Sequence, residues 1–171
     1  MPPELHFDPS QLDFQRPLAG RAEIERVNPQ RYEMEQLTAI VHVELDRNLI
    51  VGYKDVTADE FWVRGHMPGY PLMPGVLMCE AAAQLCSYYI MTYGTKQGDF
   101  LGFGGMDNVR FRGTVKPGDR LVLVSKATKL HRRQTIFNVQ GFVGSTMVFH
   151  ADIIGVPMTR QSPAPGSAEE A

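Results

Sequence analysis

The feature that most constrains the fold of this chain is one long apolar segment without a helix-breaking residue. From Val76 onward the sequence is rich in Val, Leu, Met, Cys and Ala, and neither Gly nor Pro interrupts it before Gly94. An uninterrupted run of this kind predicts one long, almost wholly buried α-helix. Glu80 is its only charged residue.

Strand patterns stand on both sides of that helix. They are rich in β-branched and aromatic residues, and polar or Gly-containing stretches separate them. The predicted strands cover residues 37–44, 49–56, 121–128, 135–143 and 146–156. Strands, then one helix, then strands predict an α+β fold in which an antiparallel β-sheet wraps around one long central helix.

Two groups suited to proton transfer lie at the start of this helix. Three prolines and two glycines between residues 66 and 75 predict a rigid extended loop, and this loop carries His66. A neutral imidazole takes a proton near neutral pH, and a carboxyl group in an apolar site, such as Glu80, can give one. A lone loop histidine is more often a hydrogen-bonded structural residue, and a helix carboxylate can serve a buried hydrogen bond. Their combination favours catalysis.

The first turn of the helix offers a third element. Its N–H groups lack acceptors within the helix and carry a partial positive charge. The N–H groups of Gly75 and Val76 are therefore candidates for an oxyanion hole, which would bind a carbonyl oxygen that gains negative charge.

Residues 66–84 read HMPGYPLMPGVLMCEAAAQ, and residues 104–111 read GGMDNVRF, followed by VKPGD at 115–119. These two ordered motifs strongly resemble those of the FabZ-type (3R)-3-hydroxyacyl-acyl-carrier-protein dehydratases, which have the hotdog fold. The histidine and the acid stand fourteen residues apart, as in that family's pattern. The resemblance covers roughly residues 53–158.

The resemblance implies a mechanism, a substrate and an assembly. In that family the histidine removes the α-proton, the helix acid protonates the leaving hydroxyl, and a glycine N–H polarises the thioester carbonyl. By position these roles fall to His66, Glu80 and Gly75, and no cofactor is expected. The histidine of one subunit works with the acid of another, so a homodimer with shared active sites is expected, and such dimers often assemble into hexamers as trimers of dimers. The partner that carries the substrate would be acyl carrier protein.

Other positions depart from the family pattern or keep two interpretations open. Of the signature PHRxPxLLVDR, this chain keeps Pro29 and Arg31 but has Gln30 between them, and Leu101 and Gly102 replace an aromatic pair that often precedes the second motif. Gln84 either orients the Glu80 carboxyl group or hydrogen-bonds in the dimer core. Candidates for an acyl tunnel are Phe61, Trp62, Met73 and Phe103, although such residues are more often plain core.

Composition limits the other function classes. The net charge of −2 gives no reason to expect nucleic-acid binding, although basic residues near a tunnel mouth would suit an acidic carrier protein. No apolar run reaches the roughly 20 residues of a membrane span, and the N-terminus lacks a signal-peptide pattern, so a cytoplasmic protein is expected. Cys79 and Cys86 lie too far apart along one helix for a disulfide, and no metal site is expected from the spacing of the histidines.

The expected organisation is an N-terminal arm over residues 1–30 with a short helix near 19–26, a hotdog dehydratase domain over 31–160, and a disordered Pro/Ser/Ala/Glu tail over 161–171. Two alternatives to the carrier-protein dehydratase stay open. One is a hotdog acyl-CoA hydratase or thioesterase. The other is a non-catalytic acyl-carrier-binding subunit.

Overall fold

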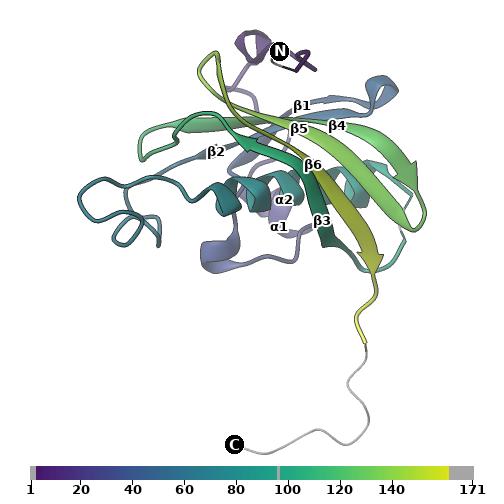
Figure 1. Ribbon diagram of the computed structural model, residues 1–171. Helices are drawn as coiled ribbons and strands as arrows, with labels where there is room; N and C mark the ends of the chain where they lie inside the picture. The colour runs from purple at the N-terminus through teal and green to yellow at the C-terminus, as the bar shows by residue number, and fades with distance from the viewer. Residues whose placement is uncertain (1–2, 96, 162–171) are drawn as a thin grey trace, which may run out of the picture.

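A computed structural model describes residues 3–95 and 97–161 (Figure 1). The 19-residue helix α2 (Gly75–Tyr93) dominates it, and α1 (Arg21–Glu25) is short. The strands are β1 (Ala39–Glu44), β2 (Leu49–Asp55), β3 (Phe100–Phe111), β4 (Arg120–His131), β5 (Gln134–Val143) and β6 (Thr146–Met158). Short 3-10 turns cover Pro9–Gln11, Tyr32–Met34 and Leu45–Arg47.

The six strands form one antiparallel sheet in the order β1-β2-β4-β5-β6-β3. The sheet curves around α2, which lies against its inner face (Figure 1). This confirms the predicted α+β hotdog fold. β1 and β3 are the two edges of the sheet.

α2 has the limits that the sequence predicts. Pro74 precedes it and Gly94 caps its end, because proline cannot continue a helix in the N-terminal direction and the glycine backbone leaves the helical conformation. Its side chains Leu85 and Cys86 share one buried cluster with Leu123, Phe137 and Phe149 of the sheet. Each such side chain contributes about 1.5–3 kcal/mol by leaving water, so this contact fixes α2 on the sheet.

The outer face of the sheet is also covered. Val51, Val122 and Phe142 form a second buried cluster, against which Phe7 and Phe14 of the N-terminal arm pack. The first part of the arm, which carries Phe7 and Phe14, lies on the side of the sheet opposite α2, whereas α1 lies on the same side as α2 (Figure 1). Since these strands are buried on both faces, they read as continuous apolar runs.

β3 is the one strand that the sequence analysis did not predict. Four of its twelve residues are glycines or polar turn formers between Gly104 and Asn108, and Asn108 has a positive φ of 53°. Such residues have low strand propensity, but pairing with β6 across irregular register shifts overrides it. The short helix expected near 19–26 is observed as α1, and most of the expected disordered tail, 162–171, lies outside the described residues.

No helix in residues 3–95 or 97–161 is both long and apolar enough to cross a membrane.

Candidate active site

His66 lies in the loop that leads into α2, and its ring is oriented by the loop itself. Its backbone N–H donates to the Trp62 carbonyl at 2.7 Å, and its own carbonyl accepts from Leu72 N–H at 2.8 Å. The ring Nδ1 lies 2.7 Å from the Leu72 carbonyl oxygen. Because a carbonyl can only accept, Nδ1 carries the proton and donates it, which leaves Nε2 of the neutral ring with a free lone pair. The side chain is exposed, so the ring is accessible from solvent.

Glu80 lies in the second turn of α2, and two amide groups converge on one of its carboxyl oxygens. Its Oε1 accepts from Gln84 Nε2 at 2.8 Å and from Gln30 Nε2 at 3.5 Å. The apolar neighbours of Glu80 in the sequence predict that this acid is buried. The structure instead leaves it half-buried.

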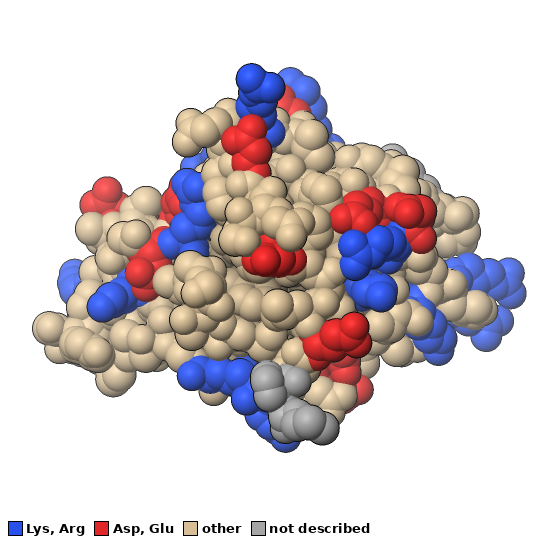
Figure 2. Space-filling view, turned by 90° about the horizontal axis from the view of Figure 1, so that it is seen from above, with Lys and Arg blue, Asp and Glu red and all other residues tan. Residues whose placement is uncertain are grey.

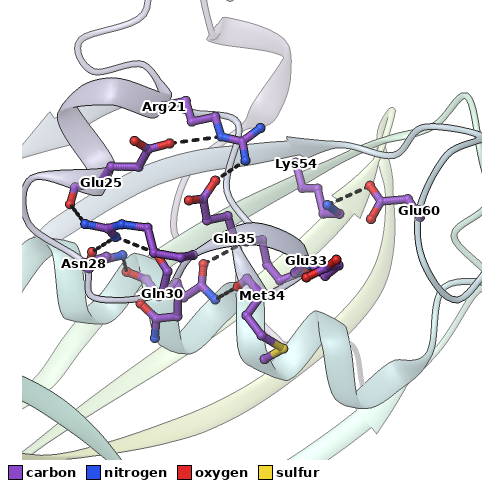
Figure 3. Close-up of polar contacts among 12 residues, drawn as sticks. Arg21, Glu25, Asn28, Gln30, Glu33, Met34, Glu35, Lys54 and Glu60 are labelled. Carbon is purple, nitrogen blue, oxygen red and sulfur yellow. Dashed lines mark hydrogen bonds and ion pairs between the residues drawn. The ribbon is translucent and has the colours of Figure 1, made fainter.

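Gln84 is buried and links Glu80 to the segment that crosses α2. Its Oε1 accepts the backbone N–H of Gln36 at 2.9 Å, and its Nε2 also donates to the Met34 carbonyl at 2.6 Å. Figure 3 shows Gln30, Met34 and Glu35 along this segment. Gln84 thus holds the Glu80 carboxyl group and joins the segment at residues 34–36 to α2 within one chain.

A small cavity of about 40 Å³ lies beside Glu80, between α2, β3 and β6. Ala83 and Ser87 line it from α2, Phe103 from β3 and Ile154 from β6. One water needs roughly 10–15 Å³ of such space, so the cavity admits a hydroxyl-sized group and not an acyl chain. The spacing of residues 80, 83 and 87 along one helix face is the sequence signal that could have identified this wall.

The structure does not join His66 to Glu80 within one chain. His66 is not among the residues that line the Glu80 cavity, and no hydrogen bond or ion pair in the described part of the chain connects the two side chains. A site that uses both groups therefore needs a second protomer or a movement of the loop.

Gly75 and Val76 are the first two residues of α2. The Pro74 carbonyl accepts the N–H groups of Leu77 and Met78, and within residues 3–95 and 97–161 no hydrogen bond takes up the N–H of Gly75 or Val76. A Cβ on Gly75 would lie 2.7 Å from the ring of Phe111, so only glycine allows this close approach. These two N–H groups are therefore free to donate to a group that approaches the start of α2.

The four candidates for the acyl tunnel lie in three different places in the structure. Trp62 and Met73 lie in the core, 4% and 3% exposed. Phe61 is exposed and lines a different, polar cavity with Lys54 and Glu60, whose side chains form an ion pair at 2.8 Å. Phe103 alone among the four reaches the Glu80 cavity.

The two cysteines take no part in this arrangement. Both thiols are free and buried, and Cys86 Sγ lies 3.4 Å from Ser125 Oγ. Burial raises the pKa of Cys79 to about 11 and that of Cys86 to about 12, so neither is a nucleophile near neutral pH. Among the described residues no His, Cys, Asp or Glu group of three or more could hold a metal ion.

Comparison with known proteins identifies relatives along most of the chain. A family model described as a FabA-like domain matches residues 28–152. The 3-hydroxyacyl-[acyl-carrier-protein] dehydratase FabZ of Clostridioides difficile (strain 630) is 35% identical over 132 residues, which are 77% of this chain and 92% of that protein. The protein of the same name from Moorella thermoacetica is 37% identical over 131 residues, 77% of this chain and 91% of that protein.

Solved structures of lower sequence identity share the fold. The dehydratase heterocomplex ApeI:P from Xenorhabdus doucetiae aligns with a TM-score of 0.67 at 15% identity, over 84% of this chain and 93% of that one. The Campylobacter jejuni protein Cj0977, described as a sigma28-regulated virulence protein, aligns with a TM-score of 0.61 at 20% identity, over 82% of this chain and 94% of that one. At these identities the likeness shows the fold alone.

Proposed function

Because the chain belongs to the FabA-like family, we propose that it dehydrates (3R)-3-hydroxyacyl thioesters on acyl carrier protein to trans-2-enoyl thioesters in fatty-acid biosynthesis. The curated relatives carry the name of this activity at 35–37% identity over most of their length. The observation that carries the proposal is the set of hydrogen bonds and the surroundings of His66 and Glu80. His66 Nδ1 lies against the Leu72 carbonyl and its Nε2 has no hydrogen-bond partner among the described residues, and Glu80 faces a hydroxyl-sized cavity while amide donors hold one of its oxygens.

The chemistry follows from these groups. His66 Nε2 takes the proton from Cα, and the electrons of that C–H bond form the Cα=Cβ double bond. The Cβ–O bond breaks, and the leaving hydroxyl takes a proton from Glu80 and departs as water. The N–H groups of Gly75 and Val76 would bind the thioester oxygen while it carries the enolate charge.

We propose a homodimer that pairs His66 of one protomer with Glu80 of the other. Met67, Tyr70 and Val76, around the His66 loop, are 48%, 63% and 66% exposed, and Phe103 and Phe111 on the edge strand β3 are about half exposed. A long edge strand with apolar side chains favours pairing with a second copy, and an exposed apolar group around a site favours burial in an interface. The small volume beside Glu80 supports a tunnel completed by the second protomer.

Acyl carrier protein is the partner that we propose for substrate delivery. Arg110, Arg112 and Lys116 are exposed near the end of β3, close to the Phe111 and Gly75 contact. Arg112 Nε donates to His150 Nδ1 at 3.2 Å, and burial together with these arginines lowers the pKa of His150, which favours its neutral form as an acceptor. Elsewhere basic and acidic side chains are interspersed, as on the face in Figure 2. We expect the protein to act in the cytoplasm.

The first test is turnover of 3-hydroxybutyryl and 3-hydroxydecanoyl thioesters, on carrier protein and on coenzyme A. Wild-type protein should release enoyl thioester, and His66→Ala and Glu80→Gln should each lower kcat by at least about a hundredfold. Preference for coenzyme A would favour a hydratase, and release of free acid would favour a thioesterase. Binding of carrier protein without any product would favour a non-catalytic subunit.

Mixing the two variants tests the shared site. A dimer that contains one His66→Ala and one Glu80→Gln protomer has one intact site if the two groups come from different protomers. Random co-assembly should then restore about a quarter of wild-type activity, since half of the dimers are mixed and each has one intact site of two. No restoration in a verified mixed dimer would place both groups in one chain.

A further inference from the structure

Gln30 carries a polar group that the mechanism above does not use. Its Nε2 lies 3.5 Å from Glu80 Oε1, and its Oε1 is buried without a hydrogen-bond donor among the described residues. The side chain also lines the cavity beside Glu80. A buried acceptor without a donor is unfavourable, so a site that keeps one points to a donor that arrives with a ligand.

The backbone around Gln30 is held in place, which makes the position of this amide reproducible. Arg31 donates from Nη1 to the carbonyls of Asn28 and Gln30 at 2.9 and 2.6 Å, and from Nη2 to the Glu25 carbonyl at 2.8 Å. Asn28 Nδ2 donates to the Gln84 carbonyl on α2 at 2.9 Å. The segment is thereby fixed to the same helix that carries Glu80.

The two amides that meet at Glu80 make its two oxygens different. Gln30 and Gln84 both donate to Oε1, so Oε1 is engaged as an acceptor. Neither amide donates to Oε2, which is therefore the oxygen that can carry and transfer the proton of the acid. A substrate hydroxyl that receives this proton must lie beside Oε2 and within reach of the same cavity.

We propose that Gln30 is a positioning residue that holds Glu80 Oε1 through its N–H and accepts a hydrogen bond from the substrate's 3-hydroxyl through its Oε1. This rests on the proposed dehydration. The hydroxyl hydrogen points to Gln30, so a lone pair of the hydroxyl oxygen faces Glu80 Oε2. When the Cβ–O bond breaks, that oxygen keeps its own hydrogen, takes the proton of Glu80 and leaves as water, while Gln30 is unchanged. The residue would thus select thioesters with a hydroxyl group at C3.

The test compares binding of two ligands that differ only in that hydroxyl. The background is His66→Ala, in which we expect turnover to be at least about a hundredfold slower, and the probes are 3-hydroxydecanoyl and decanoyl thioesters of carrier protein. Gln30→Met keeps the length of the side chain and removes its polar atoms. We expect it to weaken binding of the hydroxyacyl probe by about tenfold, the effect of one hydrogen bond, and to leave decanoyl binding unchanged.

Controls separate this role from a structural one. Gln15→Met changes an exposed glutamine of the arm and should affect neither probe. If Gln30→Met weakens binding of both probes equally, the proposal is overturned in favour of a structural role. If it weakens binding of neither probe, the proposal is also overturned, and water is the group that occupies the cavity. If Gln30→Met unfolds, the same comparison is made with Gln30→Leu. Wild-type turnover is measured in parallel, so absence of enoyl product tests the proposed function separately from the selectivity of Gln30.

Discussion

Replacing Gln84 by leucine removes the side chain that joins α2 to the segment crossing it. Gln84 is 2% exposed, and leucine fills similar space without polar atoms. The change deletes the acceptor of the Gln36 N–H and the donor to the Met34 carbonyl and to Glu80. It therefore tests whether hydrogen bonding through one side chain holds this segment on the helix.

The loss of stability depends on whether water can replace Gln84 at each of its former hydrogen-bond partners. Gln36 is 0% exposed, so its N–H is left without water and costs about 1–3 kcal/mol. Met34 is 45% exposed and Glu80 is half-buried, so water can replace the amide there and each loss costs at most about 1 kcal/mol. The free energy of unfolding should fall by about 2–4 kcal/mol, which for a chain of this size lowers Tm by roughly 5–15 °C.

The assay is urea and thermal unfolding followed by far-UV circular dichroism. The control is Gln15→Leu, which makes the same change at an exposed position and should stay within about 0.5 kcal/mol of wild type. A Gln84→Leu protein that unfolds within about 0.5 kcal/mol of wild type would refute the reasoning, because the Gln36 N–H would then have found another acceptor.

Three further outcomes follow from burial and close packing. The pKa values of Cys79 and Cys86 are raised to about 11 and about 12, so neither should react with a thiol reagent in native protein at pH 8, and both should react after unfolding. Rapid reaction of either thiol in the native protein would contradict this. Because folding raises these values, their contribution to stability is complete below the unfolded pKa near 9 and is lost as pH rises through 11 and 12, which alkaline unfolding curves would detect. Gly52→Ala should lower the free energy of unfolding by about 1–3 kcal/mol, because the new Cβ would lie 2.9 Å from Leu85 Cδ1 and 3.0 Å from the Ala39 carbonyl oxygen. An unchanged free energy of unfolding in denaturant would argue against this crowding.

Local signals account for what could be predicted from the sequence. Pro74 and Gly94 bound α2 because their effects on the backbone act within one or two residues. The turn at Asn48, with a φ of 51°, and the β-branched and aromatic composition of the strands are likewise local. The motif residues His66 and Glu80 were found for the same reason, since each is marked by its immediate neighbours.

Features that depend on contacts between distant residues were missed or misjudged. Residues 100–111 became a strand through pairing with β6, not through their own propensity, and the arm's Phe7 and Phe14 could be assigned to the outer sheet face only once that face existed. Glu80 was expected to be buried because its neighbours are apolar, yet burial is set by what packs against each helix face.

The sequence by itself therefore determined the central helix, the fold class and the two candidate proton-transfer residues, because backbone sterics and side-chain periodicity act over short stretches. Only the tertiary structure decided that Gln30 and Gln84, 50 and 4 residues from Glu80, meet at one carboxyl oxygen. It also separated His66 from that acid within a single chain. Such distances are set by the packing of the whole domain, which balances many weak contacts and leaves no mark in any one segment.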